Sequence, residues 1–330
     1  MANEYFEPIK DKVESLLSKR KSDLFIAYIT GDRRPVELLS TKIAVETVPF
    51  FYEILKKNGH KKKITLFLYS NGGELEAPWA LANLIREHCR WLEIIIPYKA
   101  FSAATLLSLA ADKILMTPLS MLSPIDPAGN FSIQNEPKTI QVEDITGYID
   151  FVKEKVGLVE QNSLTESLKS LSNQVPPVVL GSVNRTHSLV RQIAAKMLSL
   201  TKTEYSEIES KTVINNLTKE LFSHKHYISR NEAKEIGLKS IDIAKKDEES
   251  LVNEIYDFYV DKLKLNEIFN PTNHLTGEET QNTVSLDRAV ITSSNTCFVF
   301  KTDAQITKTS TPDNRPNLNV NFEEKGWVKI

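Results

Sequence analysis

Near-continuous apolar runs alternate with helical apolar spacing through the first third of this chain. The runs at residues 24–29, 64–69 and 92–97 are typical of strands that are covered on both faces. Between them, apolar residues recur every three or four positions, which predicts a helix over residues 41–58 and another with Pro78 in its first turn. Crossover helices bring successive strands back in the same direction. The pattern therefore predicts an α/β fold with a parallel sheet core.

The rest of the chain divides into a helical part and a β-rich end. Helical spacing predicts further helices over residues 5–20, 144–156 and 186–199. Residues 160–184 are rich in Ser, Asn, Gln and Pro, which predicts a loop or a break between helices. The predicted organisation has three parts: a main domain over residues 1–269, a linker over residues 270–284 and a small β-rich module over residues 285–330.

Composition narrows the class of protein. With 41% hydrophobic residues, 25% charged residues and a net charge of −2, the chain predicts a globular protein with no nucleic-acid partner. Cys89 and Cys297 are too few for a disulfide framework, which favours a reduced, cytoplasmic setting. No signal core or membrane-spanning run appears. Metal-binding and phosphate-binding motifs are also absent, so we expect no metal and no cofactor.

A candidate nucleophile follows one of the predicted buried strands. Ser102 comes after the strand at residues 92–97 and immediately before a short, strongly apolar helix. Most serines at a helix start are only caps. Here, however, the pair Gly72-Gly73 ends a neighbouring strand, where backbone N–H groups can approach a substrate closely. The N–H groups of Gly72 and Ala103, with Gly73 as a further residue of the oxyanion site, would hold the oxyanion of an acyl-transfer reaction if Ser102 attacks a carbonyl.

Three sequence motifs carry a family resemblance. They are SNGGELEAPWALANLI, KAFSAATLLSLAADKILM and LSPIDP, and a later ISRNEAKEIGLKSI adds to them. Together they resemble the Clp protease/crotonase superfamily, and within it the serine dehydrogenase proteinase family, which is related to signal peptide peptidase A. The resemblance covers roughly residues 20–245. It implies stacked β-β-α units, Ser102 as the nucleophile and an oxyanion site at Gly72-Gly73. Its Ala-Ala-Asp motif ends here at Asp112.

The general base is not evident from the resemblance. Residues 123–127, where Clp proteases carry their histidine, contain none. Lys138, in the segment Glu-Pro-Lys-Thr, is similar in place to the lysine of the stomatin-cleaving relatives, so we name it as the candidate base of a Ser–Lys dyad. Such a lysine must be buried and neutral. His224 and His187 are the alternative bases.

The sequence therefore predicts a serine peptidase that acts on a peptide or protein substrate through a Ser102 acyl-enzyme. The resemblance implies a homo-oligomer, since members of the superfamily commonly assemble. Two alternatives stay open. One is a crotonase-like acyl-CoA enzyme, which needs the oxyanion donors but no serine nucleophile. The other is a catalytically inactive oligomeric scaffold, because the histidine of a Clp-type triad is missing from residues 123–127.

Overall fold

An eight-stranded sheet runs through the molecule. The computed structural model describes residues 3–35, 39–125, 128–133, 136–220, 226–265, 267–275, 279–310 and 316–330, with the backbone alone at 128–133, 136–144, 146, 219–220, 310 and 316. In sheet order, the strands are β10 (Ile241–Ile243), β5 (Lys113–Met116), β3 (Cys89–Ile96), β2 (Lys61–Tyr69), β1 (Leu24–Thr30), β11 (Gln281–Ser293), β12 (Thr296–Ser310) and β13 (Pro316–Lys329). The five strands from β10 to β1 are parallel, which confirms the predicted α/β class and its parallel core.

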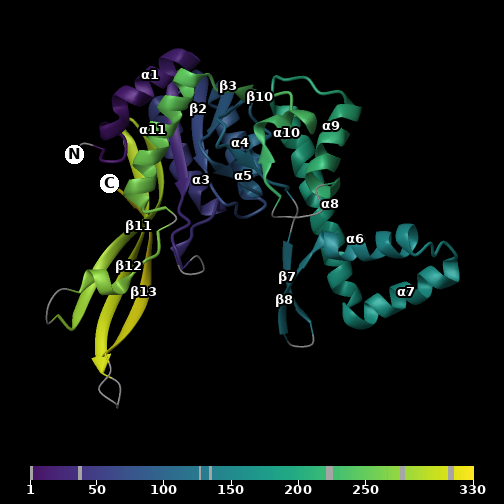
Figure 1. Cartoon of the computed structure of the whole chain (residues 1–330). Helices are drawn as coiled ribbons and strands as arrows, with labels where there is room; N and C mark the ends of the chain where they lie inside the picture. The colour runs from purple at the N-terminus through teal and green to yellow at the C-terminus, as the bar shows by residue number, and fades with distance from the viewer. Residues whose placement is uncertain are drawn as a thin grey trace.

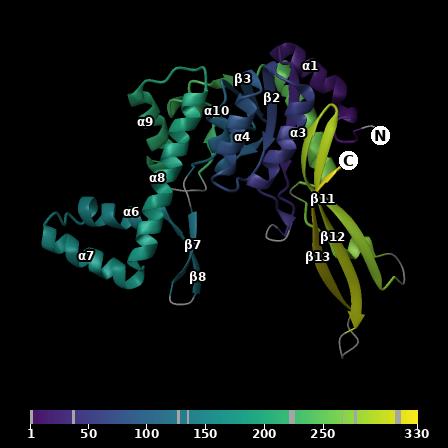
Figure 2. The ribbon, with the colours of Figure 1, turned by 180° about the vertical axis from the view of Figure 1, so that it is seen from behind.

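Helices cover both faces of the parallel strands. In β1, Ile26 and Tyr28 join the apolar core on one face, whereas Phe25 and Ala27 join the core on the other. The first face is covered by α3 (Val48–Asn58), α4 (Ala77–Arg86), α5 (Ala103–Ser108) and α8 (Pro177–Leu200). The second is covered by α1 (Lys10–Arg20) and α11 (Lys246–Leu263), which lie side by side (Figure 1, and from behind in Figure 2). Burial on both faces explains the continuous apolar runs in the sequence.

A small second sheet lies at the carboxyl ends of the central strands. It consists of β4 (Lys99–Ala100), β6 (Met121–Leu122) and β9 (Ile228–Ser229), with β6 in the middle. A bridge between Ser70 and Ala100 joins it to the end of β2. The small sheet therefore brings three distant parts of the sequence to the edge where α/β proteins place their functional groups.

The C-terminal strands continue the main sheet. β11 pairs antiparallel with β1, and β12 and β13 follow in antiparallel order. Their far ends extend beyond the layered body as a long ribbon (Figure 1). Strands were predicted within residues 285–330, and the observed ones are longer. The division of the chain into domains and a linker stays a prediction.

One expectation of local structure was wrong, and one predicted helix was confirmed over most of its length but begins later than predicted. Residues 160–184 are mostly helical, as α7 (Gln161–Gln174) and the first turns of α8. Leu164, Leu168 and Leu171 recur at helical spacing in α7, a signal that the prediction from composition passed over, although no α7 residue is buried. The predicted helix over residues 41–58 begins later, because Ile43 forms a β-bridge with Gly73 and the α-helix begins at Val48.

The remaining elements complete the chain. They are η1 (Glu7–Ile9), η2 (Val45–Thr47), β7 (Ala128–Ile133), β8 (Glu136–Gln141), α6 (Val142–Asp150), η3 (Phe151–Lys155), α9 (Glu207–Asn215), η4 (Asn216–Glu220), α10 (Arg230–Glu235) and η5 (Pro271–His274). Among the helices that the structure describes, none combines the length and apolar character that crossing a membrane requires.

Candidate active site

Ser102 has a strained backbone at the start of α5. Its φ of 49° and ψ of −111° lie in a region that residues with a side chain rarely adopt. Two hydrogen bonds fix the turn: the Ser102 N–H donates to Ser123 Oγ at 2.7 Å, and Thr105 Oγ1 donates to the Ala100 carbonyl at 2.6 Å. The Ser102 side chain is half-buried. Strain of this kind persists where the surrounding contacts hold it, as they do at many functional sites.

The backbone of Gly72 lies directly against Ser102. Gly72 has a φ of +112°, and a Cβ at this position would lie 3.0 Å from Ser102 Cβ and 3.1 Å from the Phe101 carbonyl oxygen. Only glycine has both the conformational freedom and the absence of volume that this approach requires. The structure therefore brings the serine segment and the Gly-Gly turn together, as the sequence predicted.

Gly73 is oriented by its bridge to Ile43. The Ile43 N–H donates to the Gly72 carbonyl at 2.9 Å, and the Glu74 N–H donates to the Ile43 carbonyl at 2.8 Å. In a trans peptide the N–H points opposite to the C=O of the same unit. The Gly73 N–H consequently points away from Ile43.

The N–H groups near Ser102 differ in their availability. The Gly72 N–H donates to Ser70 Oγ at 3.0 Å. The N–H groups of Gly73 and Ala103 have no acceptor among the residues that the structure describes. Ala103 is the first residue of α5, where helix geometry supplies no partner for a backbone donor. Of the three predicted oxyanion donors, Gly73 and Ala103 are thus the two that remain free within the described chain.

None of the candidate bases is seen in contact with Ser102 Oγ. His224 lies outside the described residues. Lys138 lies on β8, opposite Phe131 of β7, and its side chain is also outside the description. His187 is half-buried on α8 and has an interaction partner of its own. Lys99, the nearest preceding lysine, donates to Asp32 at 3.1 Å and is engaged there.

The segment that follows His224 packs beside the serine segment. Tyr227 stacks on Phe101, the residue before Ser102, with ring centroids 5.4 Å apart and an interplanar angle of 16°. His226 Nε2 lies 2.5 Å from Glu232 Oε1. Neither Tyr227 nor His226 was predicted as a site residue. Their position depends on the antiparallel pairing of β9 with β6. Strands of two residues are too short to show a periodic pattern, so this pairing could not be predicted from the sequence.

Asp112, the end of the Ala-Ala-Asp motif, is a buried structural carboxylate. It is fully buried and accepts two hydrogen bonds from Arg86, at 2.7 Å and 2.9 Å. It also accepts from the Leu92 N–H at 2.7 Å and the Lys202 N–H at 2.5 Å. These bonds tie α4, β3 and the segment after α8 together, so the motif marks the fold and not the chemistry.

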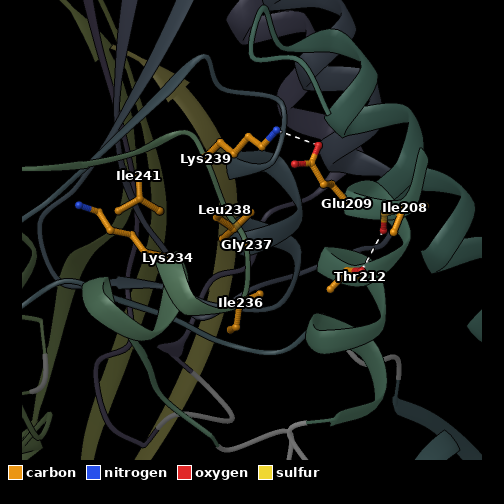
Figure 3. Close-up of a pocket in the computed structure, with 9 residues that line it drawn as sticks. All are labelled: Ile208, Glu209, Thr212, Lys234, Ile236, Gly237, Leu238, Lys239 and Ile241. Atoms are coloured by element: carbon orange, nitrogen blue, oxygen red, sulfur yellow. Dashed lines mark hydrogen bonds and ion pairs between the residues drawn. The ribbon is translucent and has the colours of Figure 1, made fainter. Parts of the chain in front are cut away.

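A separate pocket lies away from Ser102, between α9 and the segment that follows α10. Its volume is about 510 Å³, and an ion pair of 2.8 Å joins Glu209 and Lys239 at its edge (Figure 3). None of the predicted site residues lines it. No cluster of three or more potential metal ligands occurs in the part of the chain that the structure describes.

Comparison with known proteins finds one family model that matches the segment carrying the site. Residues 43–146 match the family model described as ClpP-like SDH-type serine proteinase. Two uncharacterized proteins of Methanocaldococcus jannaschii, MJ0137 and MJ1495, are 26% and 23% identical over 54% and 53% of this chain. The chain spans about half the length of these curated relatives, 53% and 51%.

Several solved structures are also similar. A mutant of the 1510-N membrane-bound stomatin-specific protease is 14% identical, with a TM-score of 0.37 over 66% of this chain and 79% of that chain. ClpP1 from Listeria monocytogenes is 16% identical, with a TM-score of 0.37 over 71% of this chain and 96% of that chain. The family match confirms the resemblance to ClpP-like serine proteinases, and it supports a serine peptidase in general.

Proposed function

We propose that this chain, whose residues 43–146 match the model of ClpP-like SDH-type serine proteinases, is a serine peptidase with Ser102 as its nucleophile. The observation that carries the proposal is the approach of Gly72 to Ser102, where an added Cβ would lie 3.5 Å from Ser102 Oγ. In this approach the turn that contains the Gly73 N–H, which has no acceptor among the described residues, lies beside Ser102 and its strained backbone. A serine that served only as a helix cap would need neither feature.

The proposed reaction is acyl transfer to and from Ser102. The Ser102 Oγ attacks the peptide carbonyl and loses its proton to a general base, which then delivers that proton to the leaving amine. The oxyanion of the tetrahedral intermediate accepts hydrogen bonds from the N–H groups of Gly73 and Ala103. Water then attacks the acyl-enzyme and restores Ser102. Gly72, whose own N–H is directed to Ser70, contributes the close approach of the turn.

Among the candidate bases, the described contacts favour His224. It lies two residues before His226 in the sequence, and the segment from His226 onward packs against Phe101 through Tyr227. Lys138, by contrast, lies on the β7–β8 hairpin, which projects from the layered body (Figure 1). We therefore propose His224 as the base and keep Lys138 and His187 as alternatives.

A fluorophosphonate probe tests the proposal, because it labels activated serines covalently. Wild-type protein should be labelled, and Ser102→Ala should not. Ser108→Ala is the matched control, since Ser108 is a buried serine of the same helix whose Oγ only donates to the Ala104 carbonyl. Failure of the folded wild type to react would refute the nucleophile and favour the inactive scaffold.

The same probe identifies the base. His224→Ala should lower the labelling rate by about 10²-fold or more, the usual contribution of a general base. Unchanged labelling of His224→Ala together with a loss in Lys138→Ala or His187→Ala would move the base to that residue. The peptide substrate and the homo-oligomer that the resemblance implies are also part of the proposal, and sedimentation velocity tests the latter.

A further inference from the structure

One buried carboxylate lies between the two loops that carry Gly73 and Ala103. Asp32 follows the end of β1 and is 6% exposed. We propose that Asp32 is a positioning residue that holds these two loops in the relative placement needed for a two-donor oxyanion hole. The inference rests on the proposed function, because it assigns Asp32 a task at that same site.

Three donors from two segments of the chain converge on one oxygen of Asp32. Its Oδ2 accepts from Tyr69 Oη at 2.7 Å, from Asn71 Nδ2 at 3.2 Å and from Lys99 Nζ at 3.1 Å. Asn71 directly precedes Gly72, and Lys99 begins β4, three residues before Ser102. The Lys99 side chain is 17% exposed, so water screens its contact with Asp32 only in part. One carboxylate thereby contacts both loops.

The electrostatics keep this carboxylate ionised and its neighbours donating. Burial by itself would raise the pKa of Asp32, but the hydrogen bond from Tyr69 and the charge of Lys99 outweigh it, and the pKa lies below its ordinary value. Burial and the charge of Asp32 raise the pKa of Tyr69, so that hydroxyl stays protonated and donates. An ionised carboxylate only accepts, which suits a position that three donors face.

A second contact from β1 shows what is particular to Asp32. Thr30 Oγ1 donates to Ser70 Oγ at 2.8 Å, and that oxygen accepts the Gly72 N–H. Thr30 therefore braces the glycine turn only. Backbone bonds already join Ser70 to Lys99 and Phe101, each at 3.0 Å. These backbone bonds end before the residues that carry the free N–H groups. Within the described residues, Asp32 is the side chain that we find bonded both to the glycine turn, at Asn71, and to the serine segment, at Lys99.

Asp32→Asn tests the inference, with Glu93→Gln as its matched control. Glu93 is a fully buried carboxylate of β3 that accepts from Arg20, Lys63 and Thr65, none of which belongs to either loop. Misplacing reacting groups by about 1 Å can cost about 10²-fold in rate, so Asp32→Asn should slow fluorophosphonate labelling by about 10- to 100-fold. Glu93→Gln should label at the wild-type rate per folded molecule.

Hydrogen exchange gives a readout that does not depend on activity. Asp32→Asn should raise amide exchange in both residues 70–74 and residues 99–104, whereas Glu93→Gln should leave both unchanged. Should Asp32→Asn not fold, Lys99→Met removes one contact alone, and it should raise exchange in residues 99–104 and slow labelling.

The outcomes separate the two proposals. The positioning role would be overturned if Asp32→Asn were labelled at the wild-type rate and its amide exchange were unchanged. It would also be overturned if Glu93→Gln changed the labelling rate and the exchange of both loops as much as Asp32→Asn does. If the wild type itself is unreactive, the peptidase proposal fails, and exchange in the two loops still decides whether Asp32 couples them.

Discussion

Gly72 and Ser102 face each other so closely that a methyl group on Gly72 would lie 3.0 Å from Ser102 Cβ. Both residues have a positive φ, +112° at Gly72 and 49° at Ser102. Two strained turns from neighbouring strands therefore meet at one point. Each is held from its outer side, Gly72 by its bond from Ile43 and Ser102 by its bond to Ser123.

Gly72→Ala should abolish labelling of Ser102 by a fluorophosphonate. The new Cβ presses on the serine, and the positive φ adds strain of about 1–3 kcal/mol to the folded state. Gly59→Ala is the matched control, because Gly59 has a φ of +67° and open space around its Cβ position. It should lose comparable stability in a urea titration while retaining labelling. Normal labelling of Gly72→Ala would contradict the close approach.

Ser123→Ala should slow labelling without unfolding the protein. It removes the acceptor of the Ser102 N–H, and leaving a buried donor without a partner costs about 1–3 kcal/mol. The turn that presents Ser102 then loses one of its two restraints. Ser108→Ala, which alters a buried serine of α5 away from this turn, should label normally. Labelling rates and urea midpoints of both variants check the expectation.

Much of the site could be predicted from sequence, because its parts lie at the ends of strongly apolar strands. Gly72-Gly73 follows one such strand, and Ser102 follows the strand after it in the chain. A parallel sheet brings the carboxyl ends of both strands to the same edge. The sequence led us to name Gly72 as the donor of the turn, and it could not show that the Gly72 N–H is already bonded to Ser70. The difference between the two glycines depends on Ser70 Oγ accepting the Gly72 N–H and on Ile43 holding the Gly72 carbonyl, so that the Gly73 N–H points away from Ile43.

Contacts that depend on long-range pairing were missed. Tyr227 reaches Phe101 only because β9 pairs with β6, and strands of two residues carry no periodic signal. Asp32 was passed over for a similar reason. A single aspartate after a strand is common, and what distinguishes Asp32 is that it accepts from the end of β2, at Tyr69 and Asn71, and from Lys99 of β4.

The two cysteines should be unreactive in the folded protein and should make its stability depend on alkaline pH. Burial raises the pKa of Cys89 to about 11 and that of Cys297 to about 12, whereas an unfolded thiol titrates near pH 8.5. A raised folded pKa contributes stability fully below the unfolded pKa and loses it as pH rises toward the folded one. The free energy of unfolding should therefore decline as the pH rises above about 8.5, which is the pKa of a thiol in the unfolded chain.

Ellman's reagent and urea titrations check this expectation. At pH 8 the folded protein should react slowly and the urea-unfolded protein should show two thiols at once. The free energy of unfolding of Cys89→Ala should decline less steeply between pH 8 and pH 10 than that of the wild type. Rapid reaction of either thiol in the folded state would show that it is exposed, contrary to the structure.

Asp112→Ala should destabilise the fold while leaving the chemistry of each folded molecule intact. Removing one partner of a buried ion pair costs about 3–5 kcal/mol, because Arg86 then keeps a buried charge without compensation. Glu207→Ala, which breaks an exposed pair with Lys211, should cost far less, because solvent screens that pair. Urea titrations measure both losses, and fluorophosphonate labelling corrected for the folded fraction measures the site. If Asp112→Ala folded stably but lost labelling, the Ala-Ala-Asp motif would belong to the active site after all.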